Sequence, residues 1–291
     1  MSTEKRTGTG KTDTRLSYSS SELLANCTQK YAHKKILGTP VDVDVEEDQK
    51  AFNIGKAFHQ VIELAKHDTE PTVQMVKRAC KTHEVLDDQA LIHAMSLKYF
   101  KLHKKSKLTC VATEFEIAND IFIGYVDAVL TDAKGNWWVT DLKTASSVQE
   151  TKLARLHSDV QLNLYSRFHE MMAKMFKLDP KKFAGARYRV TTKSKIKPLK
   201  DEMYQSYVKR LFSSVDSLEV VLPKAALNWE KAYLNHHRLH KISMAMREGK
   251  YKPRQNFWYC DSYFKPCEYW SACHGATFSE LKEKLKIEYA D

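Results

Sequence analysis

The sequence lacks the features that define several classes of protein. Nine glycines and 11% aromatic residues in a chain of 291 do not describe a disordered segment. Its apolar runs, such as residues 121–130, fall well short of the ~20 residues that a membrane-spanning helix needs. Six cysteines are too few for a disulfide scaffold at this length. We therefore expect neither a membrane protein nor a disulfide-stabilised one.

The composition describes a folded, basic protein. Hydrophobic residues make up 43% of the chain, which is enough for one large domain or two small ones. The 47 Lys and Arg residues exceed the 36 Asp and Glu residues by 11, and this excess favours a polyanionic partner such as nucleic acid. No charged segment followed by an apolar one opens the chain, so we expect a reducing, cytoplasmic location.

The spacing of apolar residues predicts an α/β arrangement with helical additions at both ends. Helices are expected from Ser19, Ser20 or Ser21 to Tyr31 and over residues 49–66, 72–99, 159–176 and 202–247, the last interrupted near Pro223. Strands are expected over residues 110–117, 121–130, 137–142 and 183–191. The chain then divides into a disordered tail (1–15), an N-terminal helical region (16–107), an α/β core (108–200), a helical region (201–255) and a cysteine-bearing segment (256–291).

Two carboxylates and an amine are predicted to meet near the ends of two strands. Side chains two apart on a strand share a face, so Asp141 and Lys143 point the same way. A short turn joins their strand to the preceding one and lets Asp127 lie across from Asp141. Paired carboxylates repel unless a cation lies between them, and hard oxygen ligands select Mg²⁺ or Mn²⁺. The alternative is an exposed Asp–Lys pair, which is common and contributes little.

Two glycines mark positions close to these acids. Gly55 and His59 are spaced i, i+4 on one predicted helix, where the missing side chain lets another backbone approach beside the imidazole. Imidazole is an acceptable third ligand for Mn²⁺, although a satisfied, half-buried helix histidine is the alternative. Gly124 lies three residues before Asp127 among branched side chains, which suggests a bulge or a close approach there.

A further polar pair lies on the helix that follows Asp141. Gln161 and Tyr165 are spaced i, i+4 and so share one helix face. Two alternatives stand beside a functional role for them. Ser158 and Gln161 have the spacing of a capping box, and Tyr165 fits an ordinary place in the core.

The order of these patterns resembles the RecB-type branch of the PD-(D/E)XK nucleases, which includes the CRISPR-adaptation nucleases and many phage exonucleases. The patterns are Gly-x-x-x-His (Gly55, His59), Gly-x-x-Asp (Gly124, Asp127), Asp-x-Lys (Asp141, Lys143) and Gln-x-x-x-Tyr (Gln161, Tyr165). The resemblance covers about residues 17–273. It implies a restriction-endonuclease-like core, a mixed central sheet flanked by helices, in a bacterial or phage-infected cell.

The resemblance also implies roles for individual residues. The metal would be bound by His59, Asp127, Asp141 and the backbone carbonyl of Leu142. Lys143 would act on the attacking water and the scissile phosphate, while Gln161 and Tyr165 would position the DNA backbone. Glu114 and Glu116 on the first strand are more simply exposed carboxylates, with a water-mediated contact to the site as the alternative.

The same resemblance implies a metal-binding role for four of the cysteines. Iron–sulfur members of the family carry one cysteine in the N-terminal helix and three after the core, a layout matched by Cys27, Cys260, Cys267 and Cys273. The six residues between Cys260 and Cys267 exceed the family's usual spacing. A 4Fe–4S cluster is favoured, with a zinc site or unrelated free cysteines as alternatives. Cys80 and Cys110 are expected in the core.

Aromatic and basic stretches suggest further contacts. The aromatic residues between Phe257 and Trp270 are expected to shield the cysteine site, with base stacking as the minority alternative. The basic runs over residues 101–107, 193–200 and 236–241 have the charge to follow DNA phosphates, although solvated helix faces also explain them.

The function expected from these features is that of a Mg²⁺- or Mn²⁺-dependent deoxyribonuclease. An exonuclease acting on DNA ends or single strands, in recombination, repair or phage DNA processing, is favoured. The alternatives are a CRISPR-adaptation-type nuclease that trims ends with partner proteins and a non-catalytic DNA-binding member of the same fold. The sequence shows no helicase motif, so unwinding would require a recombination or replication protein as partner. It predicts no oligomeric state.

Overall fold

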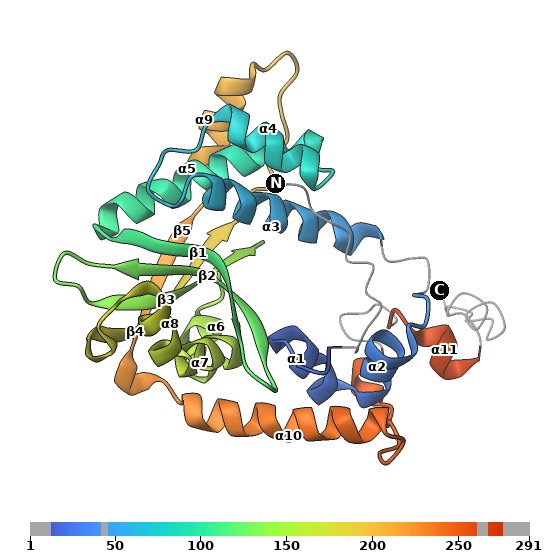
Figure 1. The fold of residues 1–291 in the computed structure, drawn as a ribbon. Coiled ribbons are helices and arrows are strands. Elements are labelled where there is room, and N and C mark those ends of the chain that lie inside the picture. Colours follow the sequence, from blue (N-terminus) through green and yellow to red (C-terminus); the bar gives the residue numbers. More distant parts are fainter. Residues whose placement is uncertain (1–12, 42–45, 261–266, 276–291) are drawn as a thin grey trace.

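The computed structural model describes residues 13–41, 46–260 and 267–275. One five-stranded sheet forms the centre of the molecule, and helices cover both of its faces (Figure 1). The mixed sheet between helices confirms the expected restriction-endonuclease-like α/β class. The predicted tail lies outside the described residues, apart from its last three. Among the described helices, none has the length and apolar character that crossing a membrane requires.

The sheet has the strand order β1-β2-β3-β4-β5. Its strands are β1 (Thr109–Ala118), β2 (Ile123–Thr131), β3 (Trp137–Ala145), β4 (Phe183–Thr192) and β5 (Ser217–Pro223). β3 and β4 are parallel, and the other neighbouring pairs are antiparallel. The four predicted strands are all present. The helical prediction for residues 202–247 is wrong over β5, because pairing of this stretch with β4 outweighs its local pattern.

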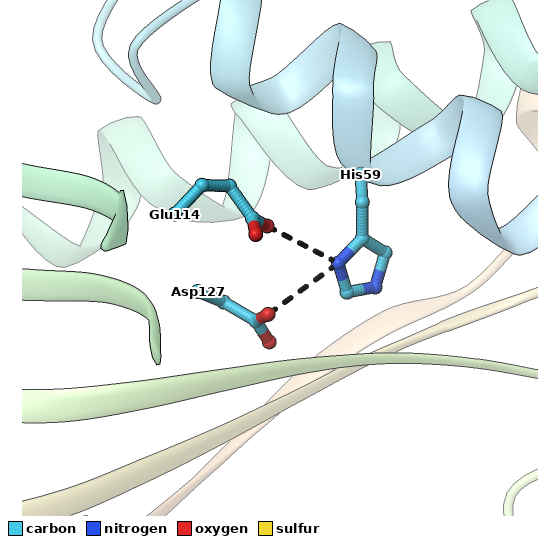
Figure 2. A group of neighbouring side chains, drawn as sticks. All are labelled: His59, Glu114 and Asp127. Atoms are coloured by element: carbon cyan, nitrogen blue, oxygen red, sulfur yellow. Dashed lines mark ion pairs between the residues drawn. The ribbon is translucent and has the colours of Figure 1, made fainter. Parts of the chain in front are cut away.

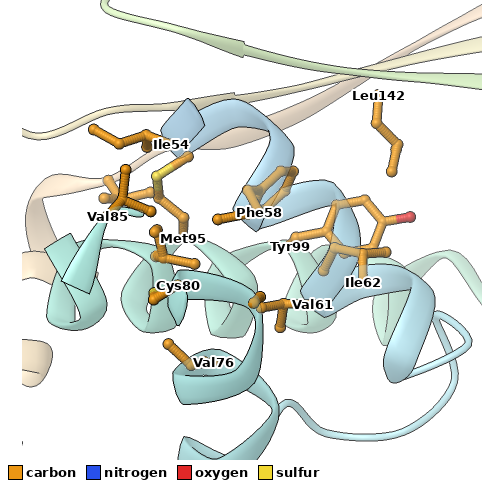
Figure 3. Close-up of a cluster of buried hydrophobic side chains, with 14 residues drawn as sticks. Ile54, Phe58, Val61, Ile62, Val76, Cys80, Val85, Met95, Tyr99 and Leu142 are labelled. Atoms are coloured by element: carbon orange, nitrogen blue, oxygen red, sulfur yellow. The ribbon is translucent and has the colours of Figure 1, made fainter. Parts of the chain in front are cut away.

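One face of the sheet is covered by α3 (Glu46–Leu64), α4 (Val73–Thr82) and α5 (Gln89–Ser106), and α9 (Tyr204–Ser214) packs on α5. The apolar stripe of α3, including Phe58 and Ile62, is fully buried against these helices and Leu142 of β3 (Figure 3). Truncating Phe58 to alanine would cost about 3–5 kcal/mol. The single helix predicted over residues 72–99 is wrong, because the chain breaks between α4 and α5, where Glu84 has a positive φ of 57°.

The opposite face is covered by α6 (Glu150–Ala154), α7 (Val160–Arg167) and α8 (His169–Phe176). These elements form the crossover between the parallel strands β3 and β4, as such a connection requires. The helix predicted over residues 159–176 is divided at Phe168, which packs on Phe122, the residue just before β2. Asp159 caps α7 by accepting a hydrogen bond from Leu162 N. The capping box expected from Ser158 and Gln161 is therefore wrong.

The N-terminal helices α1 (Tyr18–Asn26) and α2 (Thr28–Ala32) lie beside α10 (Trp229–Arg247) and the C-terminal α11 (Trp270–His274) (Figure 1). Tyr31 is buried there and shares a 2.7 Å hydrogen bond with Ser243 of α10. The side chain that caps α1 is Ser17, a little earlier than predicted. Shorter turns are His33–Leu37 (π), Leu86–Asp88, Leu156–Ser158, Pro180–Lys182, Lys224–Ala226 and Phe257–Tyr259.

A buried polar network fastens α5 to the sheet. The Arg189 side chain on β4 is fully buried and donates hydrogen bonds to Glu219 (2.6 Å) on β5 and to Tyr99 (2.9 Å) and His103 (2.8 Å) on α5. Tyr99 OH lies 2.6 Å from Nδ1 of His67, in the turn that follows α3. Removing one member of such a network leaves buried polar groups unpaired and costs about 3–5 kcal/mol when a charge is left alone.

Candidate metal centre

His59 reaches the sheet because α3 lies close to β3. A Cβ added to Gly55 would lie 3.2 Å from Thr144 Oγ1, which is tighter than most such contacts. The small residue one turn before His59 therefore sets how near the helix comes to the strand. The approach expected from the sequence is confirmed, but it involves a threonine side chain and not a backbone segment.

Two carboxylates face the imidazole from neighbouring strands. His59 Nδ1 lies 3.7 Å from Glu114 Oε1 on β1 and 3.5 Å from Asp127 Oδ1 on β2 (Figure 2). One ligand atom from each of the three residues lies within 4.8 Å of the others. Burial lowers the pKa of His59, but the two carboxylates outweigh it and raise that pKa to about 10. The pair of acids thus requires positive charge at this point.

Glu114 is held in an unusual backbone conformation. Its φ is +44°, a left-handed value that a non-glycine residue seldom adopts within a strand. The flanking pairs Thr113–Ala128 and Phe115–Val126 place it opposite Asp127. Such strain persists where the surrounding structure imposes it, and it is frequent at functional sites. The sequence alone predicts a simple exposed carboxylate at Glu114, although counting back from the turn at residues 119–122 pairs it with Asp127.

Glu116 has a different environment from Glu114. Its carboxylate accepts a 2.9 Å hydrogen bond from Tyr125 OH on the exposed side of the hairpin. Both glutamates are predicted from the sequence to be exposed strand carboxylates. That description holds for Glu116, whereas Glu114 faces His59 and Asp127.

A series of side-chain hydrogen bonds connects Asp141 on β3 with Gln161 and Tyr165 on α7. Lys143 Nζ donates to Asp141 Oδ1 at 2.9 Å and to Gln161 Oε1 at 2.8 Å. Gln161 Nε2 in turn donates to Tyr165 OH at 2.9 Å. Asp141 is only 1% exposed, which rules out the surface-pair alternative. Burial raises the pKa of Asp141 to about 7, Asp127 adds to this, and the Lys143 ammonium opposes it.

The two groups of residues are joined where β2 and β3 part. The ladder between these strands ends at the Ala128–Thr140 pair, although both strands continue. Beyond that point Asp127 Oδ2 accepts a 2.5 Å hydrogen bond from Leu142 N. The Leu142 side chain points into the core beneath α3, so its backbone alone faces the site. The structure thus gathers His59, Asp127, Asp141, Leu142, Lys143, Gln161 and Tyr165 at one place, together with Glu114.

Gly124 on β2 lies against two aromatic rings of the same region, those of Phe122 and Tyr165. A Cβ there would lie 2.7 Å from Phe122 Cζ and 2.9 Å from Tyr165 Cε1, distances that real contacts do not reach. The close approach expected from the sequence is confirmed. Because only hydrogen fits between the rings, Gly124 determines where Tyr165 stands relative to Gln161.

The four outer cysteines line one cavity between the two ends of the described chain. Cys27 comes from the junction of α1 and α2, and Cys260, Cys267 and Cys273 come from the C-terminal segment. Cys27 Sγ accepts a hydrogen bond from Lys30 N, and Cys260 Sγ accepts one from the Gln255 side chain. No three cysteine sulfurs in the described residues lie within 4.8 Å of one another.

The remaining cysteine and aromatic predictions have mixed outcomes. Cys80 is fully buried, as predicted, whereas Cys110 is only half-buried. Of the aromatic residues expected to shield the cysteines, Tyr259, Tyr269 and Trp270 line the cavity. Phe257 and Trp258 are 69% and 89% exposed, so the shielding prediction is wrong for them. Tyr263 and Phe264 lie outside the described residues.

The fold and the sequence together identify the superfamily of this protein. The sequence profile of the PD-(D/E)XK nuclease superfamily matches residues 15–274. The chain belongs to this superfamily, whose members hydrolyse nucleic acid with the help of a divalent metal, and DNA is the substrate that membership implies. No curated protein matches the chain.

Proposed function

We propose that this protein is a Mg²⁺- or Mn²⁺-dependent exonuclease of the RecB-type branch, which hydrolyses phosphodiester bonds at DNA ends or in single strands. The observation that carries the proposal is the meeting of His59, Asp127 and the Asp141–Lys143 pair at the point where β2 and β3 part. Recombination, repair and phage DNA processing are the settings that such an activity serves.

The donor set fits a divalent cation. Carboxylate oxygens from Glu114 and Asp127 and an imidazole nitrogen from His59 already face one another, and these donors suit Mn²⁺ and Mg²⁺. Asp141 and the Leu142 carbonyl are the donors that would complete the shell. In a strand the C=O of a residue points to the same side as its N–H, and Leu142 N points at Asp127. When bound, the metal would lower the pKa of a water and offset charge on the phosphate.

The protein's own side chains would divide the remaining tasks. Lys143 holds its proton strongly, because Asp141 and Asp127 raise its pKa despite burial. An ammonium there would stabilise negative charge developing on the phosphate. Gln161 keeps Lys143 in place from α7, and Tyr165 keeps Gln161 in place. The Lys143 ammonium would therefore be held in position before the phosphate binds.

Degradation assays on matched linear and circular DNA test this proposal. Purified protein with Mn²⁺ or Mg²⁺ should shorten end-labelled linear strands and leave closed circles intact. Asp141→Ala and Lys143→Ala should each reduce the rate at least 100-fold, while circular dichroism shows the fold unchanged. Protein that leaves every DNA form intact with either metal would instead support the non-catalytic DNA-binding alternative.

We further propose that Cys27, Cys260, Cys267 and Cys273 bind a 4Fe–4S cluster. Four thiolates are what such a cluster requires, and the four cysteines line one cavity. Backbone and amide N–H groups already point at Cys27 and Cys260, as is usual around cluster sulfurs. The cluster would tie the N-terminal helices to the C-terminal segment. Brown colour with four iron atoms per chain supports this assignment, and one zinc per chain contradicts it.

A further inference from the structure

A cavity of about 630 Å³ lies at the end of the sheet that carries the candidate metal centre. Its lining comes from the segments that follow β3 and β4 and from the start of β5. Ala145 and Thr192 are paired at the ends of the two parallel strands, and Lys193 N donates to Ala145 O at 2.7 Å. The carboxyl ends of parallel strands are where open α/β sheets bind their ligands.

The cavity continues directly from the candidate centre along β3. Lys143 is three residues from Ser146, where the lining begins, and a strand advances ~3.3 Å per residue. The two are therefore about 10 Å apart along the strand. A duplex rises ~3.4 Å per nucleotide along its axis and a single strand is more extended, so this separation corresponds to at most about three phosphates.

The lining has the chemistry of a phosphate-binding surface. It is rich in hydroxyl groups, including those of Ser146, Ser147 and Ser194, and it carries two lysines of the basic run over residues 193–200. Lys193 Nζ is engaged by the Ala51 carbonyl of α3, 2.8 Å away. In the part of the chain that is described, Lys195 makes no ion pair or side-chain hydrogen bond, and it is exposed. Hydroxyl and ammonium donors of this kind bind DNA phosphate oxygens.

One acid belongs to the lining and limits the charge of the cavity. Asp216 is exposed, and its backbone is tied to Thr192 by hydrogen bonds of its N–H and C=O. Two lysines against one carboxylate leave an excess of one positive charge among the lining residues. The cavity therefore suits a strand that passes through with its phosphates, and not a compact, highly charged anion.

We propose that this cavity binds the phosphodiester backbone of the substrate strand within about three nucleotides of the bond that is cut, with Lys195 as its principal cation. The proposal rests on the nuclease function proposed above and adds to it the path that the strand follows. It makes a specific demand: only DNA long enough to reach the cavity should depend on Lys195.

A length series of single-stranded oligonucleotides from two to twenty nucleotides tests this demand. Lys195→Ala should raise KM about fivefold for the longer strands, with kcat unchanged, and leave KM unaltered for strands too short to reach the cavity. It should also lower the slope of log affinity against log salt by about 0.7 for a long strand, and Lys195→Arg should restore both quantities. The matched control is Lys181→Ala, because Lys181 is exposed just before the opposite end of β4.

The outcomes separate this proposal from the one on which it rests. Equal KM values for Lys195→Ala and Lys181→Ala at every length overturn the cavity proposal while the nuclease stands. A rise in KM for Lys195→Ala that is the same at all strand lengths also overturns the cavity proposal, since Lys195 would then act at the cut bond itself. If the wild-type protein cuts no strand with either metal, fluorescence anisotropy with a labelled twenty-nucleotide strand still compares the two variants. Weaker binding by Lys195→Ala alone supports the cavity even then, and equal binding rejects it.

Discussion

Asp127 and Leu142 are joined by a 2.5 Å hydrogen bond from the backbone N–H of Leu142 to the Asp127 carboxylate, just beyond the last paired residues of β2 and β3. This bond replaces the ladder where the strands part, and so satisfies a backbone donor that would otherwise lack its partner. It also holds the second Asp127 oxygen towards His59, 3.5 Å away. One carboxylate thus ends the strand pairing and faces the candidate metal position.

Two substitutions of Asp127 separate these tasks. Asp127→Asn keeps an oxygen that accepts from Leu142 N but removes the charge, so we expect the fold to persist and metal-dependent cleavage to fall at least 100-fold. Asp127→Ala should lose the same activity and, in addition, about 1–3 kcal/mol of unfolding free energy, because the Leu142 N–H is left unpaired. Urea unfolding of the metal-free proteins measures the difference. Equal stability of the two variants would contradict the capping role.

The strained backbone of Glu114 predicts that activity and stability change in opposite directions. Glycine accepts the φ of +44° without strain, so Glu114→Gly should raise the unfolding free energy by about 1 kcal/mol while it weakens Mn²⁺ binding. Glu116→Gly is the matched control two residues along β1, and there glycine should destabilise by about 0.5–1 kcal/mol. Thermal unfolding and calorimetric Mn²⁺ titration give the two readouts. Destabilisation by both substitutions would remove the strain argument.

The contact between Gly124 and Tyr165 can be tested with a double-mutant cycle. Gly124→Ala introduces a methyl group where the rings leave no room, so we expect about 1–3 kcal/mol of destabilisation and a lower rate of cleavage. In a Tyr165→Ala background the contact with the Tyr165 ring is gone and only the Phe122 ring opposes the methyl group, so its effect on stability should shrink. Additive effects would show that Gly124 acts through Phe122 alone.

Acid should weaken the packing of α3 and α5 through His67. Burial lowers the pKa of His67 to about 3, and His67 Nδ1 shares a 2.6 Å hydrogen bond with Tyr99 OH. His67 takes up a proton near pH 6.5 in the unfolded chain but only near pH 3 in the folded chain. The free energy of unfolding should therefore fall as the pH drops from about 6.5 towards 3. The limiting slope from this group is about 1.4 kcal/mol per pH unit.

Two histidine variants isolate that contribution. His67→Gln removes the titrating group, so urea unfolding between pH 7 and pH 4 should show a shallower decline than in the wild type. His157→Gln serves as the control, because His157 is exposed beside α7. A decline as steep in His67→Gln as in the wild type would assign the acid sensitivity to other groups.

The cysteine cavity predicts a link between metal content and the chain ends. Under the cluster proposal, Cys27→Ser should abolish bound iron and lower the thermal midpoint, because the cluster would no longer link α1 and α2 to the C-terminal segment. Cys110→Ser is the control, as Cys110 lies on β1 outside the cavity. Iron analysis and differential scanning calorimetry report the two effects. Unchanged iron in Cys27→Ser would exclude this residue as a ligand.

The sequence alone was enough to predict the α/β class, four of the five strands and the local pairs Asp141–Lys143 and Gln161–Tyr165. These features follow from short-range periodicity, because side chains two apart on a strand, or four apart on a helix, share a face whatever surrounds them. The spacing of Gly55 and Gly124 also indicated close approaches, since a missing Cβ is needed only where another atom occupies its place.

Only the tertiary structure decided which distant residues meet. Glu114 became a neighbour of His59 through the β1–β2 register and its positive φ, and β5 became a strand through its pairing with β4. The bond from Leu142 N to Asp127, and the gathering of cysteines from both chain ends, likewise depend on contacts between segments far apart in sequence. Such contacts reflect the packing of whole layers, whose free energy does not reside in any local stretch of residues.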